Sequence, residues 1–170
     1  MANESDSKQR EKDAVRALIR GLGSSDGEIR GNARAGFVKM GKEAIDYLSE
    51  LVGAPIENLR LEAARALGEI GGPETAALLV EAMQNGQPDI RQAAATGLAN
   101  MGFHTLKLLL GAFINHPENK NLRAGLIAVH AAMSDPELKQ KLSPLAEALA
   151  NQVDKYEIVA ILRSTLDELG

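Results

Sequence analysis

Apolar residues recur at steps of three and four positions along most of this chain, which is the spacing of one face of an α-helix. The apolar stripe is clearest between Leu59 and Ile70. Glycines follow three of the apolar stretches, at Gly41, Gly71 and Gly102. A glycine at that place predicts a helix that ends in a left-handed conformation. The pattern therefore predicts a series of helices, and the fold class is expected to be all-α.

The helical pattern repeats itself with a period of 30 to 32 residues. Four segments align without gaps, and each carries an arginine at the same position: Arg30, Arg60, Arg91 and Arg123. Such a period is typical of helix pairs that stack into a solenoid. We expect about five helix pairs in a single domain of residues 1–170. The expected repeats are approximately 6–41, 42–71, 72–102, 103–134 and 135–170.

The segment Glu57–Met83, ENLRLEAARALGEIGGPETAALLVEAM, resembles a HEAT repeat. It is most similar to the short variant of phycobilisome-lyase-type HEAT-like proteins, and the resemblance extends over about residues 14–134. It implies an α-solenoid, a right-handed α-α superhelix whose Arg-bearing helices line the concave surface. The family's arginine usually pairs with an aspartate a few residues earlier. Here only Asp26 fits, before Arg30, so loop carbonyls are expected to bind the other arginines.

Composition and charge limit the classes of partner. The formal net charge is −4, and the chain has no tryptophan and no cysteine. Proteins that bind nucleic acid usually gather a basic excess on one face, so nucleic acid is not the expected partner. The absence of cysteine excludes disulfides and thiolate metal sites. The polar N-terminal segment and the lack of a long apolar run predict a cytoplasmic protein without a membrane segment.

No catalytic centre and no cofactor site are predicted. His104, His116 and His130 form no i,i+4 pair and have no acidic neighbour at metal-ligand spacing. The pattern links no serine to a histidine. His130 occupies a repeat position that Phe37 and Leu67 fill elsewhere, so we expect a partly buried polar residue there.

The four repeat arginines are expected to be structural, although a line of them could bind phosphates or carboxylates. A polar residue that recurs at a repeat junction normally satisfies backbone groups of the loops.

The face of the Arg-bearing helices that points away from the core is the candidate partner surface. It contains the residues one, five and eight positions beyond each arginine, among them Gly68 and Ala99. Most are small and uncharged, Arg65 is the main long side chain, and Glu62 is expected at the flank. The candidate partner-binding residues are Lys39, Leu61, Arg65, Glu69, Gln92, Thr96 and Asn100. The sequence leaves open the alternative that small residues here only allow helices to approach closely.

The main functional hypothesis is a non-enzymatic scaffold that binds a protein partner through this face. The resemblance implies a second hypothesis, an accessory subunit of a bilin lyase-like or chromophore-detaching system. A third, nucleic-acid binding like that of HEAT-like DNA glycosylases, would require a basic groove with aromatic residues, and the sequence predicts neither.

Overall fold

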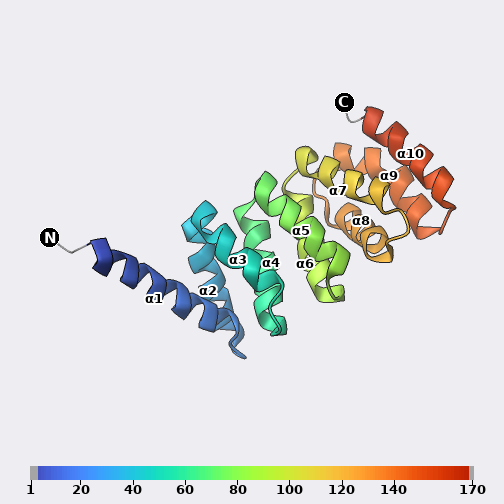
Figure 1. The fold of residues 1–170 in the computed structure, drawn as a ribbon. Coiled ribbons are helices and arrows are strands. Elements are labelled where there is room, and N and C mark those ends of the chain that lie inside the picture. Colours follow the sequence, from blue (N-terminus) through green and yellow to red (C-terminus); the bar gives the residue numbers. More distant parts are fainter. Residues whose placement is uncertain (1–3, 169–170) are drawn as a thin grey trace. The chain divides into compact units, whose positions relative to one another are not determined.

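The computed structural model describes residues 4–168, apart from the side chains of residues 4, 5, 85, 103 and 104. Residues 4–168 contain helices and no strand, which confirms the all-α prediction (Figure 1). The helices are α1 (Glu4–Leu22), α2 (Gly27–Met40), the 3-10 helix η1 (Gly41–Ala44), α3 (Ile45–Val52), α4 (Glu57–Ile70), α5 (Pro73–Asn85), α6 (Pro88–Asn100), α7 (Phe103–Asn115), α8 (Lys120–Ala132), α9 (Pro136–Ala150) and α10 (Lys155–Glu168). Taken in order, they supply a pair of helices for each predicted repeat.

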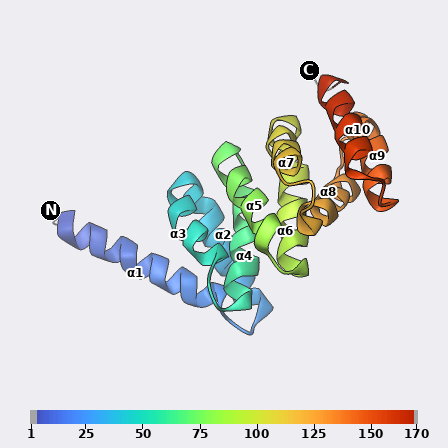
Figure 2. The ribbon, with the colours of Figure 1, turned by 45° about the vertical axis from the view of Figure 1, so that its right-hand side comes forward.

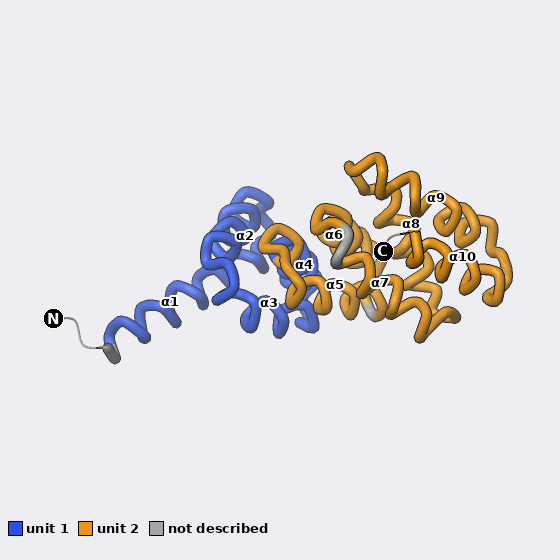
Figure 3. The backbone as a smooth tube through the Cα atoms, turned by 90° about the horizontal axis from the view of Figure 1, so that it is seen from above, with its two compact units in different colours: residues 1–66 blue, residues 67–170 orange. Residues whose placement is uncertain are grey.

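The helices gather into two compact units, residues 1–66 and 67–170, and the division falls inside α4 (Figure 3). The expectation of a single domain over residues 1–170 stays a prediction. In the first unit, α1 packs on α2, and η1 connects α2 to α3. Apolar side chains on these helices are fully or almost fully buried, among them Val15, Leu22, Phe37 and Leu48.

In the second unit, consecutive helices pack as pairs, and neighbouring pairs pack on each other (Figure 2). The pair α5 and α6 contacts α7 and α8, and α8 contacts α9, which pairs with α10. The buried apolar side chains form one core along this stack, including Leu79, Leu98, Leu109, Phe113, Leu149 and Leu162. This stacking confirms the predicted α-solenoid architecture within the second unit. The right-handed superhelix stays a prediction.

The predicted glycine helix ends are present. Gly41, Gly71 and Gly102 have φ angles of 63°, 71° and 77°, in the region that a side chain disfavours. The fourth repeat has Ser134 where the others have glycine. There α8 ends at Ala132, and Met133 is extended with a φ of −62° and a ψ of 131°. The helix therefore stops without a left-handed residue.

Two glycines of the second unit let α4 and α6 approach closely. A β-carbon placed on Gly97 would lie 2.7 Å from the Cα atom of Gly68 and 3.1 Å from Leu79. Contacts of this kind require the backbone itself to move. Gly68 is therefore small because it lets α4 and α6 pack closely, and this was the alternative to a role in the partner surface.

Gly97→Ala is expected to lower the free energy of unfolding by about 1–3 kcal/mol, because the added methyl group overpacks the contact with Gly68. Urea denaturation followed by circular dichroism measures the change. Gly111→Ala on α7 is the matched control, since a β-carbon there would meet no atom within 4 Å. The control is expected to be stabilised by roughly 0.5–1 kcal/mol, because alanine favours a helix interior over glycine. Equal effects of both variants would contradict the packing argument.

Candidate functional site

The repeat arginines bind backbone carbonyls. In three repeats the guanidinium group donates to the loop just before its own helix. Arg30 donates to Ser24 O and Ser25 O, both at 2.9 Å, Arg60 to Ala54 O at 2.8 Å and Pro55 O at 3.0 Å, and Arg91 to Gly86 O at 2.9 Å. Arg123 differs, since it donates to Leu149 O at 3.3 Å. Arg60 and Arg91 therefore bind loop carbonyls as expected, whereas for Arg123 that expectation was wrong, because its carbonyl partner lies in the last turn of α9. That the four arginines are structural stays a prediction.

Asp26 does not take the role expected for it. Its carboxylate accepts hydrogen bonds from the backbone N–H groups of Glu28 and Ile29, at 2.8 and 3.4 Å, and so caps the start of α2. The carboxylate that pairs with Arg30 is that of Glu62, with 3.5 Å between Nε and Oε1. An aspartate directly before a helix is a favoured N-cap, which explains why the Asp26 carboxylate binds the first N–H groups of α2 and not Arg30.

Glu62 is buried, whereas the sequence placed it at the flank of an exposed groove. Its side chain is only 2% exposed and is surrounded by three arginines of the first unit. Arg34 makes a short ion pair with Oε2, Arg65 lies 2.9 Å from Oε1, and Arg30 lies at 3.5 Å. A buried carboxylate requires such partners, because burial without them is costly.

This arginine cluster, formed by Arg30, Arg34, Arg65 and Glu62, is the main feature that the sequence analysis missed. Arg34 and Glu62 are 28 positions apart, on α2 and α4. No local pattern links residues at that distance in sequence. The repeat gave the only signal, a weak one, that the two residues could meet. Arg34 lies four positions beyond Arg30, and Glu62 lies two positions beyond Arg60 in the next repeat.

The candidate partner-binding residues of the first unit are Lys39, Leu61 and Arg65. Lys39 is exposed in the last turn of α2, and Leu61 is half-buried on α4. The side chain of Arg65 is 46% exposed, although its guanidinium group pairs with Glu62. Arg65 is therefore held in place while one side of it stays open to solvent.

The candidate residues of the second unit are Glu69, Gln92, Thr96 and Asn100, and all four are exposed. Gln92, Thr96 and Asn100 follow one another at four-residue steps on α6, so they share one face of that helix. The hydroxyl group of Thr96 donates to Gln92 O at 3.0 Å. Ala99 was expected on the open face but is only 9% exposed, because it is turned toward the core.

The structure links His130 on α8 to Ser143 on α9. His130 Nε2 lies 3.1 Å from Ser143 Oγ, a contact that the sequence did not predict. The Ser143 hydroxyl donates to Lys139 O at 3.0 Å, and a histidine tautomer that carries its proton on Nε2 can donate to Ser143 Oγ.

Neither a metal-binding cluster nor a helix that could span a membrane is present among the described residues. Within them, no group of three or more histidine, cysteine, aspartate or glutamate side chains could hold a metal ion. None of the helices described combines the length and apolar character needed to cross a bilayer. The side chain of His104 lies outside the described residues.

Comparison with known proteins adds two findings. Residues 15–99, half of the chain, match the family model of HEAT repeats. The chain is also similar to the bilin biosynthesis protein RpcF of Synechococcus sp. (strain WH8020), with 28% identity over 127 residues. That match covers 74% of this chain and 56% of the relative, so the chain spans a little more than half the length of the relative.

Proposed function

Because this chain belongs to the HEAT-repeat family, we propose that it is a non-enzymatic scaffold or adaptor that binds a protein partner through its Arg-bearing helices. The contacts would be made by the exposed positions of these helices. They are Lys39, Leu61 and Arg65 in the first unit, and Glu69, Gln92, Thr96 and Asn100 in the second. The proposal includes a cytoplasmic location, which cell fractionation tests.

The arginine cluster is the observation that carries this proposal. The Glu62 carboxylate holds the guanidinium group of Arg65 in an ion pair of 2.9 Å, while the Arg65 side chain remains 46% exposed. A partner that binds Arg65 therefore meets a cation whose side-chain freedom is already restricted, and this lowers the entropic cost of binding. Arginine is also one of the residues most often found to dominate the binding energy of protein interfaces.

The test is capture of a partner from native lysate by the full chain and by two variants. Arg65→Ala removes the proposed anchor in the first unit, and Thr96→Arg places a large charged side chain on the α6 face in the second. Each is expected to reduce the recovery of a specific partner by about tenfold or more, as at other interface anchors.

The control variant is Arg163→Ala, an exposed arginine on α10. The Arg163 side chain makes no hydrogen bond or ion pair within the described part of the chain. It is expected to recover the partner at the wild-type level, and circular dichroism checks that all three variants keep their helix content. Recovery of the same partner by Arg65→Ala and Thr96→Arg at the level of Arg163→Ala would refute the assignment of the surface.

The second candidate function is an accessory role in a bilin lyase-like or chromophore-detaching system. The observation that favours it is the similarity to a protein named for bilin biosynthesis. Mixing the purified chain with a free bilin separates the two candidates. A change in the visible absorption of the bilin would favour the accessory role, and an unchanged spectrum would favour the plain adaptor.

A further inference from the structure

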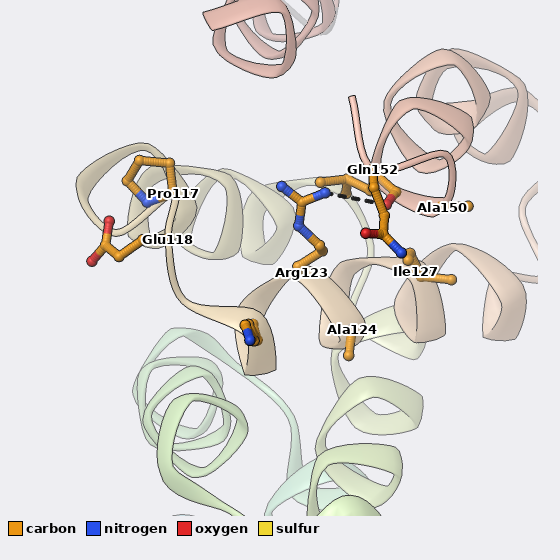
Figure 4. A pocket seen from close by; sticks show the side chains of 9 residues that line it. Pro117, Glu118, Arg123, Ala124, Ile127, Ala150 and Gln152 are labelled. Carbon is orange, nitrogen blue, oxygen red and sulfur yellow. Dashed lines mark hydrogen bonds between the residues drawn. The ribbon is translucent and has the colours of Figure 1, made fainter. Parts of the chain in front are cut away.

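A groove of about 610 Å³ lies in the second unit, between the start of α8 and the end of α9 (Figure 4). Its volume is within the range of ligand-binding sites in proteins. Side chains of α8 line one wall, and the end of α9 with the turn after it lines the other. The lining residues that matter below are Lys120, Arg123, Ile127, Leu149 and Gln152.

Arg123 makes this groove different from the corresponding places in the other repeats. Arg30, Arg60 and Arg91 use their guanidinium groups on the loops before their own helices. Arg123 instead reaches across to α9 and donates to Leu149 O, at 3.3 Å. Within the described residues its side chain makes no other hydrogen bond or ion pair. A guanidinium group carries five N–H donors, so most donors of Arg123 are available to a ligand.

The charge of the groove is positive. Lys120 and Arg123 both line it, and no carboxylate pairs with either of them in the part of the chain that the structure describes. Glu118 also borders the groove, but its side chain is 75% exposed and lies 3.7 Å from His116. Beside these cations, Ile127 and Leu149 supply apolar surface. The groove therefore offers a cationic part and an apolar part next to each other.

Gln152 gives an independent indication that the groove has a role. Its φ angle is 54°, and no other non-glycine residue has a positive φ in the described chain. Val153 N donates to Ala148 O at 3.2 Å, so Gln152 occupies the place after α9 where glycine is usual. A side chain in this conformation is strained. Residues held in such conformations cluster at binding sites, so Gln152 is a candidate contact residue of the groove.

We propose that this groove binds an acidic peptide segment of a partner protein, in which a carboxylate side chain stands next to an apolar one. Arg123 and Lys120 bind the carboxylate, because charge-assisted hydrogen bonds are the strong ones. Ile127 and Leu149 contact the apolar side chain, and the Gln152 amide pairs with the peptide backbone. The inference rests on the proposed adaptor function, but it concerns a different surface from that of Arg65.

The test is a fluorescence-anisotropy titration of the full chain against a labelled peptide, Gly-Ser-Glu-Leu-Glu-Leu-Ser-Gly, with an amidated C-terminus. Saturable binding with a Kd of roughly 100 µM is expected for so small a contact. The peptide with glutamine in place of both glutamates is expected to bind about tenfold more weakly or worse, because it lacks the charge. Equal binding of the two peptides, or no saturable binding up to about 1 mM, overturns the proposal.

Variants of the chain locate the binding. Arg123→Gln is expected to weaken binding of the glutamate peptide about tenfold, whereas Arg163→Gln, on α10, leaves it unchanged. Gln152→Gly is expected to raise the midpoint of thermal unfolding, because glycine relieves the strained φ, and also to weaken peptide binding. A purely structural Gln152 would raise the midpoint and leave binding unchanged, and that result would remove Gln152 from the site. Unchanged binding by Arg123→Gln overturns the proposal even if the peptide binds.

The two proposals can fail separately. If a partner is captured through Arg65 but the peptide does not bind, only the groove assignment is lost. If the peptide binds through Arg123 but no partner depends on Arg65 or Thr96, the groove stands and the surface of the proposed function is wrong.

Discussion

Phe113→Ala is expected to lower the free energy of unfolding by about 3–5 kcal/mol, because it leaves a cavity in the core of the second unit. Phe113 is fully buried on α7 and belongs to the largest side chains of the core. Protein interiors are close-packed, so neighbouring side chains can fill only part of the lost volume. Urea denaturation, followed by circular dichroism, measures the change in midpoint.

The matched control for this prediction is Leu108→Ala on the same helix. Leu108 is 45% exposed, so its truncation leaves no buried cavity. The free energy of unfolding is expected to change by about 0.5 kcal/mol or less. Phe113→Leu keeps most of the apolar volume, so its loss of free energy of unfolding is expected to lie between those of Phe113→Ala and Leu108→Ala. If Leu108→Ala were as destabilising as Phe113→Ala, the assignment of the core-facing side of α7 would be wrong.

Glu62→Ala is expected to lower the free energy of unfolding by about 2–4 kcal/mol, because it leaves the cations around it without their shared carboxylate. Removing one partner of a buried ion pair costs roughly 3–5 kcal/mol in other proteins. Here the arginine side chains are 24–46% exposed, so water can solvate them in part and the loss is expected to be smaller. Thermal unfolding of the variant measures the effect.

Glu50→Ala provides the comparison for Glu62. Glu50 is exposed on α3 and makes no hydrogen bond or ion pair among the described side chains. Its removal is expected to change stability by about 0.5 kcal/mol or less. Glu62→Gln keeps the shape and one acceptor oxygen but loses the charge, so its effect is expected to be intermediate. A Glu62→Ala variant as stable as Glu50→Ala would mean that the arginine cluster contributes nothing to the fold.

Glu62 also connects stability with the proposed function, and the variants distinguish the two roles. Loss of Glu62 frees Arg65 to take other conformations, so partner recovery is expected to fall even under conditions where the variant is folded. Arg65→Ala should affect partner recovery more than stability, because its side chain is nearly half exposed.

The places where sequence interpretation succeeded share a local cause. The helices and their glycine ends follow from apolar spacing within some fifteen residues and from the conformational freedom of Gly41, Gly71 and Gly102. The interpretation failed at Glu62 and at Ser143. Each of these residues meets its partner across two helices, and helical spacing describes only which face of one helix a residue occupies.

By itself, the sequence determined the all-α class, the repeat and the helix ends of this protein, because hydrophobic periodicity and glycine act over short distances along the chain. Tertiary structure alone decided that Glu62 is buried among arginines from two helices. It also decided that Arg123 donates to a carbonyl at the end of α9 instead of to the loop before its own helix. The physical reason is that a charged side chain is stable in a partly buried place only where packing brings it a partner, and packing joins residues that are distant in sequence.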